Sequence, residues 1–440
     1  MSGVRVVDPG LRALGLTLPG FVDRGEVIAS LPSLGLLTIA AHTPPHWEVT
    51  YREIDALDEE ELRAIEAERY DLVALSSLTA RVEDAYRLAD RLRLAGTTVV
   101  LGGLHATALP EEALGHVDAV IQGQGELAWP RLLQDLERGA LQSRYTSIGD
   151  AALAHRLDAS LVPRYDLLDP VRFDRLPLQT TRGCPRDCAF CGASRLLGPY
   201  QVKPIRQVRR ELERILERWP RPFIELADDN TFLDRPWSME LAALLGEHQV
   251  RWFTETDLSV ADDEHLLEAL ARSGCAQLLI GLESTAPAAL HGIDSAGWKA
   301  RQGASALDRV RRIQSHGVAV NGCFVLGLDG DDPGAFDRVM EFSEEAGLCD
   351  VQITLLTPFP GTALYARLRA EGRLLRERFW DECTLFDLTF QPAAMSVAEL
   401  RSGFCDLMRR LYGPEATRRR RARWRAVHRG ARIAGPERKT

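Results

Sequence analysis

Between residues 176 and 370 the chain repeats one pattern, in which six short apolar runs are separated by amphipathic stretches. Short apolar runs bounded by polar turns predict buried strands, and the stretches between them predict helices. The predicted strands are Leu178–Thr181, Phe223–Ala227, Arg251–Thr256, Gln277–Ile280, Ala319–Leu326 and Val351–Leu356. The predicted helices lie around Val208–Arg218, Trp237–Leu245, Asp263–Ser273, Ala304–His316 and Ala335–Glu345. Strand–helix–strand crossovers place their strands parallel, so these units predict an open, partial (β/α)6 barrel with its chemistry at the carboxyl ends of the strands.

The loop after the first predicted strand carries three of the eight cysteines, Cys184, Cys188 and Cys191, in the pattern CxxxCxxC. Three thiolates from one polar loop can hold an iron–sulfur cluster, and three ligands instead of four leave one iron open. A zinc loop is the alternative, because zinc also takes cysteines at this spacing. A closed zinc site needs a fourth ligand, and no histidine lies between His155 and His248. The spacing therefore favours a cluster over zinc.

Polar and acidic residues follow the other predicted barrel strands. Each one alone could be a solvated loop residue or a helix cap. Because the carboxyl ends of parallel strands share one rim, their joint placement predicts a binding site there. The residues are Asp228, Asp229 and Asn230 after the second strand, Glu255 and Ser259 at the third, and Gly281 and Glu283 at the fourth.

Residues 1–150 also alternate strands and helices, which predicts a doubly wound parallel sheet. The predicted strands are Val4–Val7, Glu48–Ile54, Leu72–Leu75, Thr98–Leu101 and Ala119–Ile121, and Leu36–Ala41, Asp58–Glu68 and Val82–Leu94 are predicted helices. In such sheets ligands bind beyond the carboxyl ends of the strands. The turns found there are Ser76-Ser77-Leu78-Thr79, Gly102-Gly103-Leu104-His105 and Gly123-Gln124-Gly125-Glu126. Ordinary tight turns are the alternative, and the first strand lacks the GxGxxG turn of a nicotinamide site.

The segment Thr181-Arg-Gly-Cys184-Pro-x-x-Cys188-x-Phe190-Cys191 resembles the cluster loop of radical S-adenosylmethionine (SAM) enzymes. The resemblance implies a 4Fe–4S cluster on the three cysteines, with SAM chelated to the open iron. One electron from the cluster then cleaves SAM to methionine and a 5′-deoxyadenosyl radical. The residues implied in SAM binding are Phe190, Asp228, Asp229, Asn230, Glu255, Ser259, Gly281 and Glu283.

Residues 32–41, 102–112 and 120–126 resemble the cobalamin-binding domain that precedes many radical SAM domains. The residues implied in cobalamin binding are Ser76, Ser77, Thr79, Gly102, Gly103, His105, Gly123, Gly125 and Glu126. Domains that ligate cobalt through a histidine carry Asp-x-His-x-x-Gly after the second strand. This chain has no histidine between His46 and His105, so we expect cobalamin without a cobalt-bound histidine from that loop.

Together the two resemblances imply a class B radical SAM methylase. Such an enzyme moves a methyl group from SAM through methylcobalamin to an unactivated carbon of a small-molecule substrate. An electron donor such as flavodoxin or ferredoxin, with its reductase, is the implied protein partner. A cyclisation or ring rearrangement, as in the similar anaerobic magnesium-protoporphyrin cyclase, is one alternative, and a non-catalytic cobalamin-binding protein is another. A tRNA methylthiotransferase needs cysteines in its first domain, and no cysteine precedes Cys184.

The expected domains are the cobalamin-binding domain 1–150, a connector 151–175, the barrel 176–370, a mostly helical cap 371–413 and a basic tail 414–440. The 440 residues carry a net charge of −9, which disfavours nucleic acid as a partner. Residues 415–440 alone carry +8, and we expect this tail to be solvated or disordered. No signal peptide or membrane span is evident, and Cys275, Cys323, Cys349, Cys383 and Cys405 are expected in the core, which predicts a cytoplasmic protein.

Overall fold

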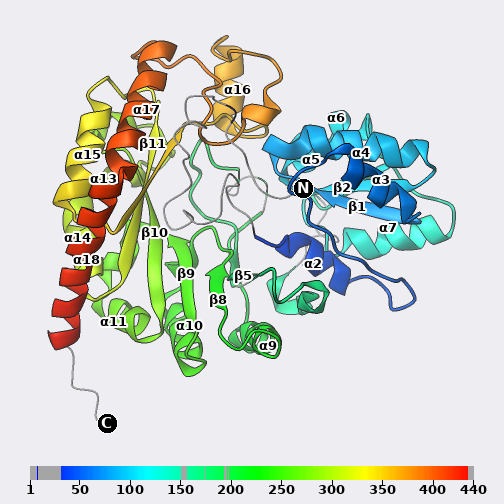
Figure 1. Cartoon of the computed structure of the whole chain (residues 1–440), viewed down its shortest axis with the longest axis horizontal. Helices are drawn as coiled ribbons and strands as arrows, with labels where there is room; N and C mark the ends of the chain where they lie inside the picture. The colour runs from blue at the N-terminus through cyan, green and yellow to red at the C-terminus, as the bar shows by residue number, and fades with distance from the viewer. Residues whose placement is uncertain are drawn as a thin grey trace.

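The structure is a computed structural model that describes residue 7 and residues 31–149, 156–173, 175–192, 196 and 198–434, with side chains described as far as residue 427. Its described part contains a four-stranded sheet, a six-stranded sheet and a small two-stranded sheet. Figure 1 shows the four-stranded sheet and its helices beside the larger, six-stranded unit.

The N-terminal sheet is parallel, and its strands lie side by side in chain order. The strands are β1 (Leu72–Ser76), β2 (Thr98–Gly102), β3 (Ala119–Gln122) and β4 (Arg144–Thr146). The helices are α2 (Leu34–Ala41), α3 (Glu59–Ala67), η2 (Thr79–Arg81), α4 (Val82–Leu94), α5 (Leu104–Ala108), α6 (Pro110–Leu114) and α7 (Ala128–Glu137). Val99 and Leu101 share one buried cluster with α3 and α4, whereas Val100 packs with α7. Helices thus cover both faces of the sheet, as predicted.

The N-terminal domain differs from the prediction in two places, at Glu48–Ile54 and at β4. Of the predicted strand Val4–Val7 only Val7 is described, and the rest lies outside the described residues. The predicted strand Glu48–Ile54 is wrong, because this segment joins no sheet. Its alternating residues are held by side-chain bonds instead: the Tyr51 hydroxyl donates to Glu53 and accepts from the backbone N–H of Ser33. The short strand β4 was not predicted.

The six-stranded sheet has the predicted partial-barrel topology. Every neighbouring pair is parallel, and the order β12-β11-β10-β9-β8-β5 leaves β5 and β12 as open edges. The strands are β5 (Arg175–Leu178), β8 (Phe223–Leu226), β9 (Arg251–Thr256), β10 (Cys275–Glu283), β11 (Ala319–Leu326) and β12 (Asp350–Leu355). The first strand therefore ends earlier than the predicted Leu178–Thr181. Thr181–Arg182 instead forms β6, which pairs antiparallel with β7 (Gln201–Val202).

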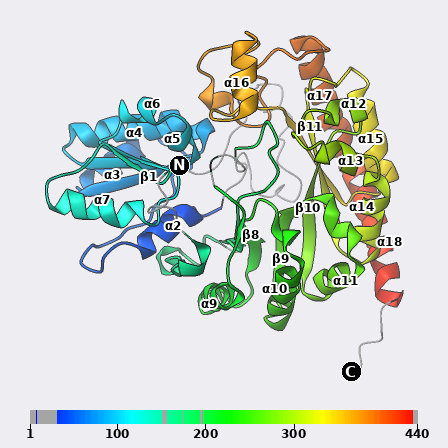
Figure 2. The same ribbon diagram turned by 180° about the vertical axis from the view of Figure 1, so that it is seen from behind.

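Helices cover the outer face of this sheet, as Figures 1 and 2 show from opposite sides. They are α9 (Ile205–Leu216), α10 (Arg235–Glu247), α11 (Glu264–Arg272), α12 (Pro287–Leu290), α13 (Trp298–Gly303), α14 (Ala306–Ser315) and α15 (Ala335–Glu345). Short 3₁₀ turns occur at η3 (Leu157–Ala159), η4 (Tyr165–Leu167), η5 (Thr231–Leu233) and η6 (Leu258–Asp262). Asp234 and Asp263 begin α10 and α11 by accepting backbone N–H bonds, as acidic N-caps do.

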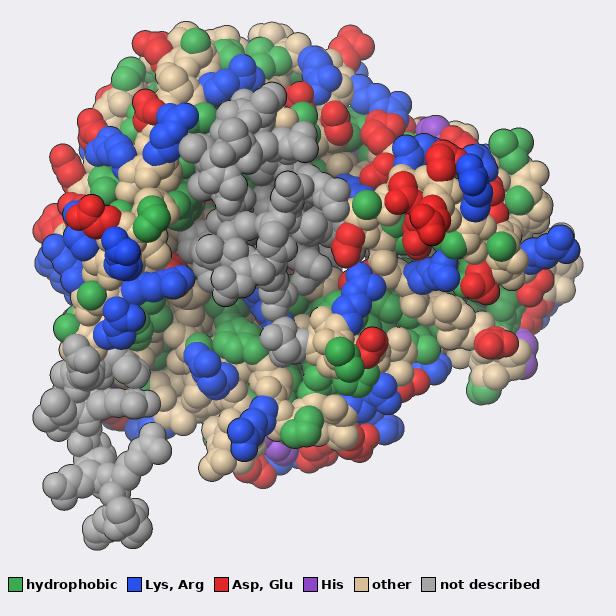
Figure 3. Space-filling view, viewed as in Figure 1, with side chains coloured by type: hydrophobic (Ala, Val, Ile, Leu, Met, Phe, Trp, Pro, Cys, Tyr) green, Lys and Arg blue, Asp and Glu red, His purple; other side chains and the backbone are tan. Residues whose placement is uncertain are grey.

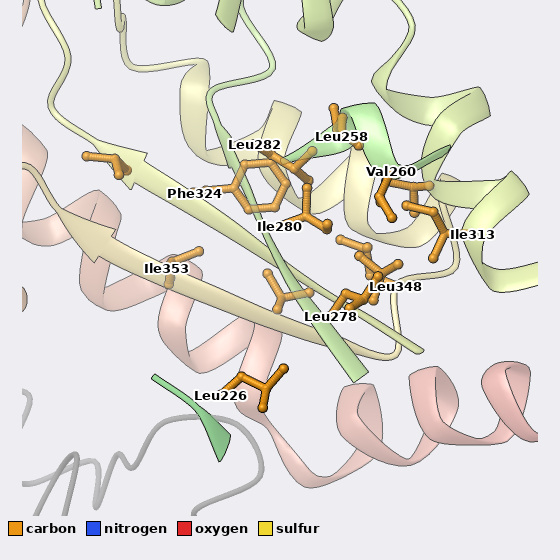
Figure 4. Packing of buried hydrophobic residues seen from close by; sticks show 14 of the residues in the cluster. Leu226, Leu258, Val260, Leu278, Ile280, Leu282, Ile313, Phe324, Leu348 and Ile353 are labelled. Carbon is orange, nitrogen blue, oxygen red and sulfur yellow. The ribbon is translucent and has the colours of Figure 1, made fainter. Parts of the chain in front are cut away.

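The two faces of the barrel sheet differ in chemistry. Most outward side chains are apolar and pack under the helices; Leu226, Leu278, Ile280, Phe324 and Ile353 are among them (Figure 4). Their neighbours in sequence point to the lumen because side chains alternate along a strand. By this alternation and the strand register, the lumen-facing side chains include Arg175, Glu225, Glu255, Gln277, Asn321, Cys323, Asp350 and Gln352. The lumen therefore carries many polar side chains beside apolar ones such as Phe253 and Leu279, whereas the outward face is mostly apolar.

The C-terminal region contains α16 (Ala363–Ala370), η7 (Trp380–Glu382), α17 (Val397–Tyr412) and α18 (Pro414–Ala434). The predicted cap is helical only from Val397 onward, because residues 371–396 are mostly turns. The expected solvated or disordered tail is also wrong as far as it is described. Helix α18 packs on α14, α17 and β12, and Ala416 and Arg420 are buried in that contact.

The outer side of α18 is strongly basic. Exposed arginines follow one another along it, and Figure 3 shows the Lys and Arg side chains that gather where α18 and α14 lie. The exposed residues are Arg418, Arg419, Arg421, Arg423 and Arg425. Among the helices that the structure describes, none is long and apolar enough to cross a membrane.

Candidate cofactor site

The three cysteines lie together in the loop between β6 and β7, above the carboxyl end of β5. Cys188 is buried, whereas Cys184 and Cys191 are half-buried. The backbone N–H of Cys191 donates to the carbonyl of Cys188, which is a turn that brings both residues back toward Cys184. The cysteine loop is closed at its base by the β6–β7 pairing, so its position depends on β6.

Asp228 holds the base of the cysteine loop. It follows β8 and is 5% exposed, and its carboxylate accepts the backbone N–H groups of Thr180 and Thr181 at 2.7 and 2.8 Å. The Thr180 hydroxyl and the Thr231 hydroxyl also donate to it. These bonds explain why β5 ends at Leu178: the next N–H groups point to Asp228 instead of a neighbouring strand. Burial raises the pKa of Asp228 to about 6, although the four donors oppose that shift.

Asp229 and Asn230 also contact the cysteine loop. Asp229 accepts the backbone N–H of Gly183 at 3.0 Å, directly before the first cysteine. The Asn230 amide lies 4.0 Å from the Cys184 sulfur and donates to Asp257 at 2.9 Å. The sequence predicted SAM contacts for the Asp-Asp-Asn segment. In the structure its side chains contact the cysteine loop.

A segment after β10 covers the cysteine loop from the other side. The N–H of Ala189 donates to the carbonyl of Ile293 at 2.7 Å, and Asp187 accepts from the N–H of Ser295. The Arg186 guanidinium lies 3.6 Å from the centre of the Trp298 ring, which is a close cation–π contact. The loop is thus held on both sides before any cofactor is added.

The thiols of the loop fit an iron–sulfur cluster chemically. Burial raises the pKa of Cys184 and raises that of Cys188 to about 12, so both are protonated in the metal-free fold. Metal binding must displace those protons, as cluster assembly does. No three His, Cys, Asp or Glu side chains in the described part of the chain converge closely enough to bind a single metal ion. A 4Fe–4S cubane bonds each thiolate to a different iron.

The predicted SAM residues on the next strands lie along the lumen and its rim. Glu255 lies deep in the barrel, but much of its side chain is not covered by other residues. Its uncovered surface faces the lumen and not the outside of the molecule. Burial in the barrel, and then repulsion from Glu225, Asp229, Asp228 and Glu283, raises the pKa of Glu255 to about 7.

At the end of β10 the chain bulges between Gly281 and Glu283, and Glu283 takes a left-handed φ of 64°. This turn points Glu283 at Lys299, whose ammonium donates to Glu283 at 2.6 Å and to the Gly281 carbonyl at 2.8 Å. A Cβ atom on Gly281 would lie 3.0 Å from the Lys299 ammonium and would displace the Glu283 carboxylate, so a side chain there would disturb this ion pair. Ser259 lies on η6, where its N–H bonds Asp257. Phe190 is half-buried against the main core.

The predicted cobalamin turns lie together at the carboxyl edge of β1, β2 and β3. Gly103 and Gly123 have φ of 98° and 85°, conformations that favour glycine. A Cβ atom on Gly103 would lie 3.3 Å from the Ser76 hydroxyl, and one on Gly125 would lie 3.2 Å from Ile39. Gly103 therefore lets its turn pack against the end of β1, and Gly125 lets its turn pack against α2. Gly102 meets only ordinary contacts, and Ser77 is buried with its hydroxyl on the Leu78 carbonyl.

Three exposed leucines mark the same edge. Leu78, Leu104 and Leu127 follow β1, β2 and β3, and they are 45%, 45% and 38% exposed. Large apolar side chains at one rim of a sheet indicate a surface that an apolar group covers. A corrin ring presents such a group, so this edge fits cobalamin.

His105 does not lie on that exposed surface. It is 2% exposed, its ring nitrogens lie 3.4 Å from Thr79 and from Glu112, and the Trp380 ring packs edge-on against it. The Trp380 indole donates to Glu112 at 3.0 Å. Burial raises the pKa of Glu112, but the bonds from His105 and Trp380 outweigh it and the net pKa is lowered. The contacts join η7 to the N-terminal domain, so His105 acts here as a packing and bonding residue.

Glu126 is also turned away from the exposed edge. It is 4% exposed, and one of its carboxylate oxygens accepts from Arg182 at 2.6 Å. This ion pair joins the third cobalamin turn to the cysteine loop. It brings the two predicted cofactor sites into direct contact.

Sequence reasoning missed several of these residues. Asp257 follows a predicted strand and could have been found by that signal. Arg182 lies inside the recognised motif, but its partner is 56 residues away and nothing in the sequence marks it. Lys299 and Trp380 lie far from any strand end, so no local signal identifies them.

The chain matches two families of known proteins along most of its length. Residues 22–133 match the B12 binding domain, and residues 178–343 match the Radical SAM superfamily. Residues 362–439 match a domain of unknown function, DUF4070.

Among curated proteins, the bacteriochlorophyllide d C-12(1)-methyltransferase of Chlorobaculum tepidum is 29% identical over 412 residues, which cover 91% of this chain and 86% of that enzyme. The hopanoid C-2 methylase of Rhodopseudomonas palustris is 28% identical over 411 residues, covering 90% and 74%. Among solved structures, the radical SAM methyltransferase TsrM of Kitasatospora setae, with cobalamin and a [4Fe-4S] cluster bound, has a TM-score of 0.69 at 17% identity. That match covers 99% of this chain and 100% of TsrM. The likeness to TsrM establishes a common fold.

The cysteine loop at the barrel rim, the glycine turns with their exposed leucines and the two family matches agree. The zinc alternative and the tRNA methylthiotransferase alternative find no support among them. The cofactors are a 4Fe–4S cluster, SAM and cobalamin. The chain belongs to the radical SAM superfamily, as an enzyme whose N-terminal domain binds cobalamin.

Proposed function

We propose that this protein is a cobalamin-dependent radical SAM methyltransferase that acts on an unactivated carbon of a small-molecule substrate. When bound, the cofactors supply the methyl group and the 5′-deoxyadenosyl radical that removes hydrogen from the substrate. The observation that carries the proposal is the contact between the cysteine loop and the cobalamin turn through Arg182 and Glu126. Two cofactor sites joined by a buried ion pair suit a reaction in which both cofactors serve one substrate.

The protein's own residues would perform three tasks in this reaction. Cys184, Cys188 and Cys191 would hold the cluster. Gly281, Glu255 and Ser259 would border SAM on the lumen side of the rim, whereas Asp228 and Asp229 would fix the loop beneath it. Leu78, Leu104 and Leu127 would cover the corrin ring and keep water from the reacting carbon, as a radical intermediate requires.

Reconstitution tests the proposal without knowledge of the substrate. The full chain is assembled anaerobically with iron, sulfide and hydroxocobalamin, and then given SAM and a strong reductant. About four irons and one cobalt per chain are expected, as one cubane and one corrin require. Transfer of a methyl group from SAM to cobalamin leaves S-adenosylhomocysteine, in about one equivalent per cobalt, beside 5′-deoxyadenosine. 5′-Deoxyadenosine without S-adenosylhomocysteine would favour a cyclase or rearranging enzyme, and cobalt binding with neither product would favour a non-catalytic protein.

Leu104→Glu should weaken cobalamin binding while the fold persists. The side chain is already 45% exposed, so a charge costs the fold little, but it would be buried against the corrin ring. Loss of one apolar contact of this size, about 2 kcal/mol, corresponds to at least about tenfold weaker binding. Titration with hydroxocobalamin, followed by its visible spectrum, measures the effect. Leu94→Glu is the matched control, because Leu94 is 87% exposed at the end of α4, on the opposite edge of the sheet.

Glu255→Gln should stabilise the cofactor-free chain above pH 7. The carboxyl has a folded pKa of about 7, above its ordinary value, so its ionisation opposes folding as the pH rises through 7. Because the lumen holds solvent, we expect a gain of only about 1 kcal/mol at pH 8. Urea unfolding at pH 8 and pH 5 measures it, and the gain should shrink at pH 5. Glu268→Gln on the exposed face of α11 is the control; an equal gain at both pH values would contradict the assignment.

We further propose the division into a cobalamin-binding domain at 1–150, a connector at 151–175, a barrel at 176–370, a cap at 371–413 and a tail at 414–440. A cytoplasmic location and a flavodoxin- or ferredoxin-type electron donor agree with the chemistry, because the cluster needs one electron for each SAM cleavage. Reduction of the reconstituted cluster by such a donor and its reductase tests the partner.

A further inference from the structure

One buried ion pair crosses between the two cofactor regions. Arg182 Nη2 donates to Glu126 Oε1 at 2.6 Å, and the two side chains are 12% and 6% exposed. Arg182 also donates to Gln179 Oε1 at 2.8 Å, which fixes the direction of its guanidinium. A charged hydrogen bond in so dry a place is short and directional.

The arginine end of this pair is tied to the cluster loop. Arg182 is the last residue of β6, where it pairs with Gln201 of β7, and Cys184 follows two residues later. Between them Gly183 is held by Asp229 and has no room for a side chain against Gly198 and Pro199. A shift of Arg182 must therefore move the first cysteine with it.

The glutamate end is equally fixed in the cobalamin-binding domain. The turn before Glu126 is held by Thr107, whose hydroxyl accepts the Gly123 N–H at 2.9 Å, and by Ser147, whose hydroxyl accepts the Gln124 N–H at 2.7 Å. Helix α7 begins at Ala128, two residues after Glu126, and the Trp129 N–H donates to the Gly125 carbonyl. Glu126 is therefore held in a fixed position relative to the turn on which the corrin is expected to lie.

We propose that Arg182 and Glu126 are positioning residues that fix the distance and orientation between the cluster and the corrin. This inference rests on the proposed function. Groups that react in sequence on one carbon must be placed to a fraction of an ångström. A different ion pair between the connector and the same domain, Arg172 with Asp55 at 3.1 Å, is 45% and 38% exposed and is weaker for that reason. The buried Arg182–Glu126 pair is therefore the better suited of the two to fix the distance and orientation between the cluster and the corrin.

The test measures geometry instead of turnover. The full chain is loaded with a reconstituted cluster and with cobalamin, and both centres are brought to their paramagnetic states, the reduced cluster and cob(II)alamin. Their magnetic interaction splits the cob(II)alamin EPR signal by an amount that depends on distance and orientation. The parent chain is expected to give one resolved splitting. Glu126→Ala and Arg182→Ala are each expected to lose it, with iron and cobalt contents unchanged. The double variant should be no worse than either single change, because the residues act as a pair.

The control variant and the results that would overturn the proposal can be told apart. Asp55→Ala breaks the exposed pair and should keep the parent splitting. An unchanged splitting in a fully loaded Glu126→Ala protein would overturn the proposal. So would loss of cobalt with an intact cluster in that variant, since Glu126 would then serve only its own cofactor. If Arg182→Ala loses its cluster, Glu126→Ala, which leaves the cysteine loop untouched, decides the matter. Failure of the parent chain to bind cobalt would instead reject the proposed function itself.

Discussion

Cys188→Ala is expected to abolish SAM cleavage and to leave cobalamin binding intact. Cys188 is 7% exposed at the centre of the loop, and each of the three thiolates bonds a different iron of the cluster. With one ligand removed, the cluster is not retained and no electron reaches SAM. The cobalamin turns lie on another sheet and do not use this side chain. Iron and sulfide content, 5′-deoxyadenosine and the hydroxocobalamin spectrum measure the three effects together.

Cys405→Ala provides the matched control, because Cys405 lies on α17, outside the cysteine loop. That variant should keep its full iron content and its SAM cleavage. Retained 5′-deoxyadenosine formation in Cys188→Ala would refute the cluster assignment. Loss of cobalt from the same variant would mean that the two cofactors are assembled together and not independently.

Asp228→Ala is expected to have the second-largest effect, on stability and on cluster retention at once. The carboxylate accepts from two backbone N–H groups and two hydroxyls, all of them buried. Removing the acceptor leaves these donors without partners, at a cost of about 3 kcal/mol in the free energy of unfolding. The same donors fix the base of the cysteine loop, so the reconstituted iron content should also fall. Thermal unfolding and iron analysis measure the two losses.

Asp331→Ala separates the effect on stability from the effect on cluster retention. Asp331 is a buried carboxylate at the same rim, where it accepts from the N–H groups of Gly327 and Leu328 at 3.0 and 3.1 Å and from Ser284. Its loss should cost a similar stability but leave iron incorporation unchanged, because none of its partners belongs to the cysteine loop. Equal iron loss in both variants would show that the deficit follows from general destabilisation and not from the loop.

The barrel itself could be predicted from the sequence because its strands are short segments rich in apolar residues that alternate with amphipathic helices. The ranges predicted for β9 and β11 agree with the structure residue for residue. The N-terminal strand predicted at Glu48–Ile54 was wrong: the segment joins no sheet, and the Tyr51 hydroxyl instead donates to Glu53 and accepts from the N–H of Ser33. The described part of the tail, as far as Ala434, was misjudged because its many charges suggested a solvated segment, whereas Ala416 and Arg420 are buried where α18 packs.

The candidate site also has features that the sequence could locate and features that it could not. The cysteine triad and the glycine turns could be located from spacing alone, since a cluster loop and a tight βα turn are both local structures. The protein contacts of Asp228, His105 and Glu126 could not. Each was predicted to touch a cofactor, and each is buried against protein groups from a distant part of the chain.

The sequence by itself therefore determined most strands of the two sheets and the cysteine loop, and it predicted an edge for cobalamin, because hydrophobic period, turn chemistry and ligand spacing are set within short segments. Tertiary structure alone decided which polar residues hold the loops of the candidate site. Three contacts join residues that are far apart in sequence. They are the ion pair of Glu126 with Arg182, the hydrogen bond from Thr180 to Asp228 and the ring contact of Trp380 with His105. A buried charge must find a partner wherever the fold brings one within reach, and that partner is fixed by packing and not by spacing.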